Sequence, residues 1–362
     1  MIGVVLISGC SLRSKPAPGE IGLKKNIIGT KLHGVRTDAG VLVEKLKSAG
    51  INTVFAGRGC FDKKQQFIGQ CHKHGIKIFA IFGVFVDSSA IKKDPSLATI
   101  NAMGKPTHAE RKWYRLVCPN RLDYRKKKKA QIVAFLAKHP VDGLSLDFIR
   151  YGVEWEMIKP EVSPGLNQEY CFCAICLKKF GERYTLPGNM DTPELARYIL
   201  KNYSNEWTMF KCESITSMVK EIRESAEEAR PGIKIAIHAL PWTEKDYNDG
   251  ARRLGGQDFK ALSQYADILS PMCYHYMLYR KDSSIHDVAA YMAKQDCCVV
   301  PCVQAAIIFR KDDIFLPQQF GKAIDQALLP PSSGINLYTW GILEKMPESK
   351  KVWIEKLGRD AH

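Results

Sequence analysis

The sequence predicts an α/β fold, a (β/α)8 TIM barrel with long insertions after strands 3 and 4, and three observations support it. Eight short apolar runs rich in Val, Ile and Phe are typical of parallel strands buried on both faces. Amphipathic segments with helical spacing separate these runs. No glycine-rich phosphate-binding fingerprint follows the first run, which argues against a doubly wound nucleotide-binding sheet. The predicted strands span residues 27–34, 51–56, 76–86, 141–149, 233–240, 266–275, 299–306 and 334–340.

The segments between the predicted strands carry the start and stop signals of helices. Asp38 is a suitable N-cap for a helix that ends at Gly50, and a second segment of the same design ends at Gly75. Residues 123–139 place apolar side chains on one side and lysines on the other. A long helix is ended by Pro231 and the glycine after it.

Two connections are too long to be simple loops. One covers residues from about 87 to 122 and follows the third strand, and the other covers residues 152–202 and follows the fourth. Both therefore leave the C-terminal ends of strands, where barrels build their active sites. We expect residues 23–362 to form a single barrel domain that carries these two insertions.

The start of the chain resembles the end of a bacterial lipoprotein signal followed by a linker, residues 1–22. A short apolar stretch ends in "ISGC", which would make Cys10 the acylated residue, although the basic start of a signal peptide is absent. We therefore expect an exported lipoprotein, in the periplasm or at the outer membrane, with an accidental match as the alternative. No run of 18 apolar residues predicts a membrane-spanning helix.

The chain carries a formal net charge of +15, which attracts anionic partners such as nucleic acid, an acidic polysaccharide or a lipid surface. Part of this charge is the run "RKKKK", residues 125–129, which we expect to be a solvated helix face. No motif of a nucleic-acid-binding module accompanies the charge, so we expect no nucleic-acid partner.

The stretch "VDGLSLDFIRY" is an apolar strand that ends in two charged residues, Asp147 and Arg150. A carboxylate at this end of a barrel strand is suited to glycoside hydrolysis, and a neighbouring arginine favours its ionised form. A structural ion pair is the alternative. Hydrolysis usually needs a second carboxylate, and we place Glu154 in the site. The other candidates are Glu156, Glu169, Asp87 and Glu344.

Aromatic and polar residues recur at the ends of the last four predicted strands. Their rings offer apolar faces to the C–H surfaces of sugars, and their polar tips offer hydrogen bonds to hydroxyls. Each residue alone could equally belong to the core. The predicted substrate-binding residues are His238, Trp242, Tyr274, His275, Gln304, Tyr338 and Trp340.

The motif "CFCAIC" brings Cys171, Cys173 and Cys176 close enough to share one metal ion. A closed structural zinc site needs four ligands, and Cys118 in the other long connection is the best fourth candidate. Such a zinc ion would join the two insertions. Free or disulfide-bonded cysteines are the alternative.

These motifs resemble known families over about residues 25–345. "DGLSLDFIRY" and "GGQDFKALSQYADILSPMCYHYM" resemble the uncharacterised barrels described as family 10-like glycosyl hydrolases. "CFCAICLKKF" resembles the cysteine cluster of family 42 β-galactosidases, which binds structural zinc together with an upstream cysteine. The Asn-Glu pair that those enzymes carry after strand 4 is absent from "DFIRYG", and "PCVQAAIIF" lacks their second catalytic glutamate. The resemblance therefore implies the barrel, the zinc ligands and Asp147, but not a two-glutamate mechanism.

The sequence favours a glycoside hydrolase that acts on a poly- or oligosaccharide, with Asp147 as its catalytic carboxylate and Arg150 orienting it. The positive net charge is consistent with an anionic glycan. One alternative is a catalytically inactive barrel that binds glycan. Another is a hydrolase of a different bond that uses His238 or His275 as its base.

Overall fold

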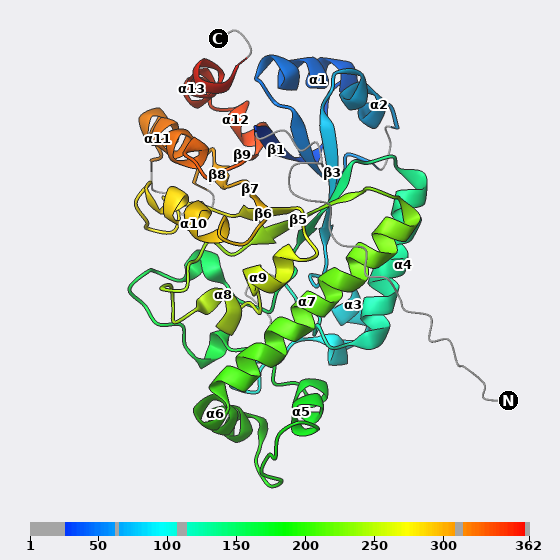
Figure 1. The fold of residues 1–362 in the computed structure, drawn as a ribbon, viewed down its shortest axis with the longest axis vertical. Helices are drawn as coiled ribbons and strands as arrows, with labels where there is room; N and C mark the ends of the chain where they lie inside the picture. Colours follow the sequence, from blue (N-terminus) through cyan, green and yellow to red (C-terminus); the bar gives the residue numbers. More distant parts are fainter. Residues whose placement is uncertain (1–25, 62–64, 107–113, 308–313, 359–362) are drawn as a thin grey trace, which may run out of the picture.

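Parallel strands pair side by side in a curled sheet, with helices on its outer surface (Figure 1). The computed structural model describes residues 26–61, 65–106, 114–307 and 314–358. Within these ranges the order of the strands is β7-β6-β5-β4-β3-β2-β1-β9-β8. The strands are β1 (Ile27–Gly34), β2 (Thr53–Gly59), β3 (Lys77–Gly83), β4 (Gly143–Asp147), β5 (Lys234–Ala239), β6 (Ile268–Pro271), β7 (Cys298–Val299), β8 (Cys302–Gln304) and β9 (Gly334–Tyr338).

The barrel closes through a strand that is divided at a proline. β7 pairs with β6, whereas β8 pairs with β9, and two residues separate β7 from β8. The first of them, Val300, donates its N–H to Leu269 in β6, and the second, Pro301, accepts from Asn336 in β9. Because proline has no N–H, the ladder is interrupted there. β7 and β8 together are the seventh strand of the predicted (β/α)8 barrel, which the structure confirms.

The barrel interior is apolar at the end where the strands begin. The rings of Phe55 and Phe79 lie 5.3 Å apart between their centres, and aliphatic side chains from β1, β5 and β6 pack with them. Gly143 begins β4 beside this cluster. A Cβ atom on Gly143 would lie 2.4 Å from the Phe79 ring and 2.8 Å from the carbonyl oxygen of Lys234. Glycine is therefore required where β4 enters the barrel.

The helices outside the barrel follow the predicted signals. Asp38 caps the first helix and accepts hydrogen bonds from the N–H groups of Gly40 and Val41. The helices that surround the sheet are α1 (Ala39–Ser48), α2 (Gln65–Lys73), α4 (Leu122–Lys138), α7 (Ser204–Ala229), α8 (Gly250–Arg253), α9 (Phe259–Ser263), α10 (Ser284–Met292), α11 (Pro317–Leu328), α12 (Trp340–Leu343) and α13 (Pro347–Leu357).

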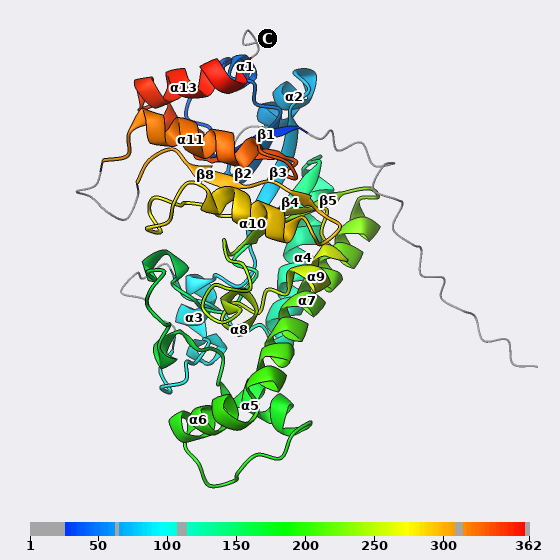
Figure 2. The same cartoon turned by 60° about the vertical axis from the view of Figure 1, so that its left-hand side comes forward.

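The two long connections meet at one end of the molecule, opposite α1 and α13 (Figure 2). Asn101 in the first connection pairs with Tyr170 in the second, and the N–H of Phe172 donates to the carbonyl of Ile100 over 2.8 Å. The two insertions are thus bonded to each other through their backbones. They contain α3 (Ser88–Lys93), η1 (Pro95–Leu97), η2 (Trp155–Met157), η3 (Leu166–Gln168), α5 (Ala174–Gly181) and α6 (Thr192–Asn202).

The basic run on α4 is not a uniformly solvated face, so that expectation is wrong for two of its members. Arg125 is 4% exposed and pairs with Glu221 on α7, and Lys128 is 8% exposed and donates to the carbonyl of Gly83 over 3.2 Å. Arg125 is buried by the packing of α4 against α7, and Lys128 is buried where α4 lies against the end of β3.

The predicted signal remnant, including Cys10, lies outside the described residues. Within the part of the chain that the structure covers, no helix is both long enough and apolar enough to cross a lipid bilayer.

We expect Gly143→Ala to lower the free energy of unfolding by about 1–3 kcal/mol, because the added methyl group overpacks the barrel interior. Gly188→Ala is the matched control, since a Cβ atom there would meet no heavy atom within 4 Å. Urea denaturation of both variants measures the difference. Equal stability of the two would contradict the packing argument.

Candidate active site

Asp147 is the last residue of β4, at the end of the barrel that faces the insertions. It pairs in register with Gly83 of β3, and its side chain is 20% exposed. The next residue, Phe148, has a φ of +50°, which is rare for a bulky residue, and its N–H donates to Asp147 Oδ1 over 2.8 Å. Arg150 is buried, and its Nη1 lies 3.9 Å from the same oxygen. The turn after β4 therefore places one hydrogen-bond donor, the Phe148 N–H, and one positive charge, Arg150, beside the carboxylate.

His238 on β5 contacts three polar groups inside the barrel. Its Nε2 lies 2.8 Å from Ser145 Oγ, and its Nδ1 lies 3.1 Å from Asp147 Oδ2. The same Nδ1 lies 3.2 Å from the Nζ atom of Lys31 on β1. An ionised carboxylate only accepts hydrogen bonds and favours a hydrogen on Nδ1, whereas the Lys31 ammonium group only donates and favours a bare Nδ1. Ser145 Oγ donates to Nε2 in the first case and accepts from it in the second.

The electrostatic surroundings keep Asp147 ionised. Burial works to raise its pKa, but the hydrogen bond with His238 and the positive charges of Lys31 and Arg150 hold that pKa well below its usual range. Burial and the charge of Lys31 lower the pKa of His238, against the opposing pull of Asp147. Near neutral pH the site therefore contains a carboxylate and a neutral imidazole.

Ser145, His238 and Asp147 have the connectivity of a catalytic triad, but burial argues against a serine nucleophile. Ser145 and His238 are both fully buried in the barrel, whereas Asp147 is the member that solvent reaches. A substrate at the mouth would meet the carboxylate and not the hydroxyl group. His238 is likewise closed to solvent, so the arrangement does not present it as a base to substrate.

Two tyrosines, Tyr274 after β6 and Tyr338 at the end of β9, border the same region. The rings of Tyr274 and Tyr338 lie 5.0 Å apart between their centres, and Lys31 Nζ lies 5.2 Å from the centre of the Tyr338 ring. Burial first, and then the negative charges of Asp147 and Glu156, raise the pKa of Tyr338 to about 12.

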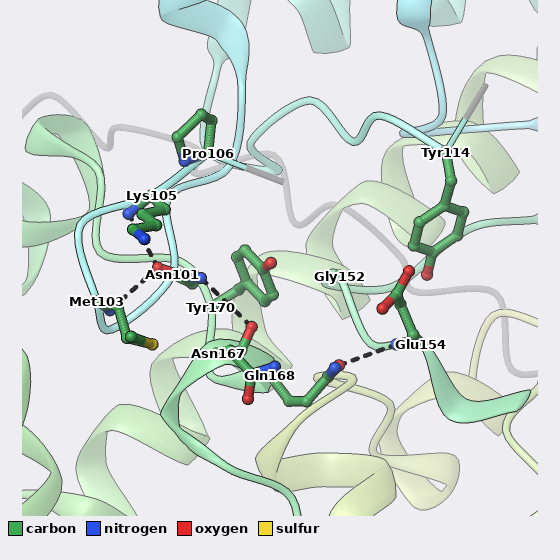
Figure 3. A pocket seen from close by; sticks show the side chains of 10 residues that line it. All are labelled: Asn101, Met103, Lys105, Pro106, Tyr114, Gly152, Glu154, Asn167, Gln168 and Tyr170. Atoms are coloured by element: carbon green, nitrogen blue, oxygen red, sulfur yellow. Dashed lines mark hydrogen bonds between the residues drawn. The ribbon is translucent and has the colours of Figure 1, made fainter. Parts of the chain in front are cut away.

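A cavity of about 390 Å³ lies between the two insertions (Figure 3). Glu154 lines it, and the N–H of this residue donates to Gln168 Oε1 over 3.0 Å. Tyr114 also lines it and packs on Phe148, with 5.7 Å between ring centres. Asp147 does not line the cavity, but Phe148 follows it directly in the chain. The remaining lining residues are Asn101, Met103, Lys105, Pro106, Gly152, Asn167 and Tyr170.

The four cysteines predicted to share a metal ion are brought together. The sulfur atoms of Cys118, Cys171, Cys173 and Cys176 all lie within 4.8 Å of one another, and all four residues are buried. The described cysteines are free thiols, so none of these four is in a disulfide. This cluster could hold a metal ion, because four thiol groups around one point match a tetrahedral site.

Backbone and side-chain N–H groups donate to the sulfur atoms of the cluster. The N–H of Ile100 donates to Cys171 Sγ over 3.4 Å, and the Nδ2 of Asn120 donates to Cys176 Sγ over 3.3 Å. Hydrogen bonds from the neighbouring thiols lower the pKa of Cys173, whereas burial raises the pKa of Cys171 and the hydrogen bond with Cys118 raises that of Cys176. Donors of this kind orient and stabilise the sulfur atoms that hold a metal.

Four of the predicted substrate-binding side chains lie in the packed interior. Trp242 is 1% exposed and packs on Tyr247, and Trp340 is also 1% exposed. His275 is 4% exposed against Phe315. Gln304 accepts from the N–H of Met277 over 3.1 Å and so supports the loop after β6. These four residues therefore make contacts of the core. The structure brings the other three, His238, Tyr274 and Tyr338, to the Asp147 site.

The sequence reasoning missed Lys31, Ser145 and Tyr114. Lys31 had a usable signal, because a lysine inside the apolar run "IIGTKLHG" is unusual for a buried strand. Ser145 alternates with apolar residues in "GLSLD", so it faces the barrel interior as Asp147 does. Tyr114 had no signal, since only the fold brings the first insertion against the turn after β4.

A sequence model described as "Putative glycosyl hydrolase domain" (DUF4015) matches residues 23–295. The chain belongs to this family. Among curated proteins, none matches the chain. The predicted relation to family 10-like glycosyl hydrolases stays a prediction.

Several solved glycoside hydrolases have a similar fold. The glycoside hydrolase domain of PgaB (BpsB) from Bordetella bronchiseptica has a TM-score of 0.69 at 11% identity, over 91% of this chain and 98% of that one. Alpha-L-fucosidase isoenzyme 2 from Paenibacillus thiaminolyticus has a TM-score of 0.60 at 13% identity, over 92% of this chain and 49% of that one. A catalytic mutant of Gan42B, a GH42 β-galactosidase from G. stearothermophilus, has a TM-score of 0.59 at 12% identity, over 92% and 57%. This chain spans about half of the latter two, and the likeness shows the barrel fold.

We expect His275 to make the protein less stable in acid. Burial lowers its pKa from 6.5 to about 4, so between these values the unfolded chain binds a proton that the folded chain does not. The stabilisation is complete above pH 6.5 and is lost as the pH falls toward 4. Urea denaturation of wild type and His275→Gln should show that wild type loses about 3 kcal/mol more between pH 7 and pH 4. Equal losses in the two proteins would contradict this.

Proposed function

We propose that this protein is a glycoside hydrolase that acts on a poly- or oligosaccharide, with Asp147 as its catalytic carboxylate. The observation that carries the proposal is the environment of Asp147, a partly exposed, ionised carboxylate at the catalytic end of a barrel strand, bonded to His238. The family description and the glycosidase folds of the similar structures support the same class of activity.

The proposed roles follow from the charges around the site. A carboxylate that stays ionised is suited to act as a nucleophile, a base or a stabiliser of positive charge, rather than as the acid. Arg150 would orient Asp147 and favour its anion. The acid would come from the segment after β4, where Glu154 lines the cavity and the charge of Glu156 acts on Arg150.

The substrate would lie along the mouth of the barrel and enter the cavity between the insertions. The cavity volume is in the range of small-ligand sites, and its amide and phenol groups can bond sugar hydroxyls. The rings of Tyr274 and Tyr338 would offer apolar faces. Lys105 and Glu154 bring opposite charges to the cavity, so the proposal of an anionic glycan rests on the net charge of +15 alone.

We further propose that the cysteine cluster binds a structural zinc ion. Four thiolates leave no open coordination position, so the ion would have no part in the reaction. Cys118 belongs to the first insertion, and the other three ligands belong to the second. The ion would therefore keep together the two walls of the cavity. The proposed location of the protein is the cell envelope, through a lipid on Cys10.

We expect wild-type protein to release reducing ends from a poly- or oligosaccharide, and Asp147→Asn to lower kcat by about 10²- to 10⁴-fold, because the amide cannot carry the charge. The measurement is a screen of neutral and acidic glycans at fixed protein concentration. Asp142→Asn is the matched control: it lies just before β4, at the opposite end of the barrel, and its side chain is equally exposed at 20%. This control should keep wild-type activity.

Equal release by wild type and Asp147→Asn would remove Asp147 from the mechanism. Release by neither, with glycan binding intact, would favour the alternative of a barrel that binds glycan without cleaving it.

We expect about one zinc ion per purified chain, because the cluster provides one set of four ligands. Cys173→Ser should lose this metal, whereas Cys212→Ser, a buried cysteine outside the cluster, should keep it. Elemental analysis by mass spectrometry measures both. A metal-free wild type whose cluster thiols are oxidised in pairs would contradict the zinc proposal.

A further inference from the structure

Asn120 is a buried amide beside the cysteine cluster. It is 5% exposed and follows Cys118 by two positions in the first insertion. Its backbone N–H donates to Cys118 Sγ over 3.4 Å, and its side-chain Nδ2 donates to Cys176 Sγ over 3.3 Å. Asn120 therefore contacts two of the four sulfur atoms of the cluster, one from each insertion.

A lysine fixes the orientation of this amide. Lys179 on α5 places its Nζ 3.4 Å from Asn120 Oδ1. An ammonium group only donates hydrogen bonds, so the amide oxygen must face Lys179 and the NH₂ group must face the other way. The reversed amide would set one donor against another and would turn its oxygen toward Cys176 Sγ. The contact with the sulfur atom is therefore made by a donor.

The two hydrogens of Nδ2 serve three acceptors. Ser214 Oγ on α7 lies 3.1 Å from Nδ2, and it can accept because its own hydrogen goes to the carbonyl oxygen of Phe210 over 2.8 Å. The other hydrogen is shared between Cys176 Sγ and the hydroxyl group of Tyr151, each 3.3 Å away. The amide thus joins the cluster to α7 and to Tyr151.

Tyr151 ends the turn that carries the candidate carboxylate. It is fully buried and lies four positions after Asp147, next to Arg150. Its N–H donates to the carbonyl oxygen of Gly255 over 2.9 Å, which anchors the turn against the segment after α8. The bonds of Asn120 therefore run from the cysteine cluster to the segment that follows β4.

We propose that Asn120 is a positioning residue that holds Cys118 and Cys176 in place as metal ligands and couples their order to the turn after β4 through Tyr151. N–H groups directed at ligating sulfur atoms orient them and set the affinity of the site. Four thiolates around a divalent ion carry an excess of negative charge, which the amide and Lys179 offset. The inference rests on the proposed zinc site and not on glycosidase activity.

The first measurement is metal binding by the full chain, with zinc titrated against a chromophoric chelator and cobalt(II) followed by absorbance. Asn120→Asp keeps the shape of the side chain and replaces its NH₂ donor by oxygen. Zinc affinity should fall by about 10- to 100-fold. The sulfur-to-cobalt charge-transfer bands should move to longer wavelength, because a sulfur atom that loses a hydrogen bond gives up an electron more easily. Lys179→Met should lower zinc affinity by a smaller factor.

Matched variants separate this role from a general effect on charge or packing. Lys178→Met removes the same charge from an exposed neighbouring position of α5 and should leave zinc affinity unchanged. Asn52→Asp alters an amide at the opposite end of the barrel, where its oxygen accepts from the N–H of Ile28, and should also leave zinc affinity unchanged. Asn120→Ala replaces Asn120→Asp if circular dichroism shows that the aspartate variant does not fold.

The second measurement is hydrogen exchange by mass spectrometry in a peptide that covers residues 148–151. Removal of zinc from wild type should speed exchange in this peptide, because the turn loses the order that Asn120 passes to it. In Asn120→Asp the exchange there should be fast even with saturating zinc. Peptides from β2 should exchange alike in all samples.

Equal zinc affinity and unmoved cobalt bands in a folded Asn120 variant would overturn the proposal. Exchange in residues 148–151 that ignores the removal of zinc would overturn the coupling to the turn. A wild type that binds neither zinc nor cobalt(II) would overturn the zinc site and this inference together. If the metal results agree but no glycan is cleaved, only the glycosidase function fails.

Discussion

Closure of the parallel sheet is the constraint on which the site depends. β1, β4 and β5 converge on one opening only because the strand from β7 to β8 joins β6 to β9. Lys31 and His238 are 207 positions apart in the sequence, and closure places their polar atoms 3.2 Å apart. Without the strand from β7 to β8, the open sheet would have β6 and β9 as its edges, and the polar side chains of the interior would lie in water. The barrel instead forces these groups into one small interior volume.

Enclosing these polar groups requires that their charges be matched. Aromatic and aliphatic side chains fill the barrel at the end where the strands begin. The end that faces the insertions contains a lysine, a histidine, a serine and a carboxylate. An unpaired buried charge is strongly unfavourable, so each group is tolerated because of its neighbours. The same matching leaves one member, Asp147, reachable from solvent. The same arrangement therefore keeps Asp147 ionised and leaves its carboxylate open to a substrate.

Much of the fold could be predicted from the sequence, and the site only in part. All eight predicted strands coincide with observed ones, because strands buried on both faces leave continuous apolar runs. A closed zinc site needs four ligands and the "CFCAIC" motif supplies three, which pointed to the distant Cys118 as the fourth. The structure brings all four sulfur atoms together. Trp242, His275 and Trp340 show the limit, because position at a strand end does not reveal whether a loop covers the side chain. Tyr114 shows the converse, since contacts between insertions leave no local pattern.

The position of the cysteine cluster along the chain has a consequence for folding. The segment between Cys118 and Cys171 contains α4, the whole of β4, Asp147 and half of the residues that line the cavity. The proposed zinc ion would join the two ends and close this segment into a loop, which would remove conformational entropy from the unfolded chain. The strand that carries the candidate carboxylate would then be restrained in the unfolded ensemble. A chain without the ion would lose local order in this part of the barrel before the rest of the sheet opens.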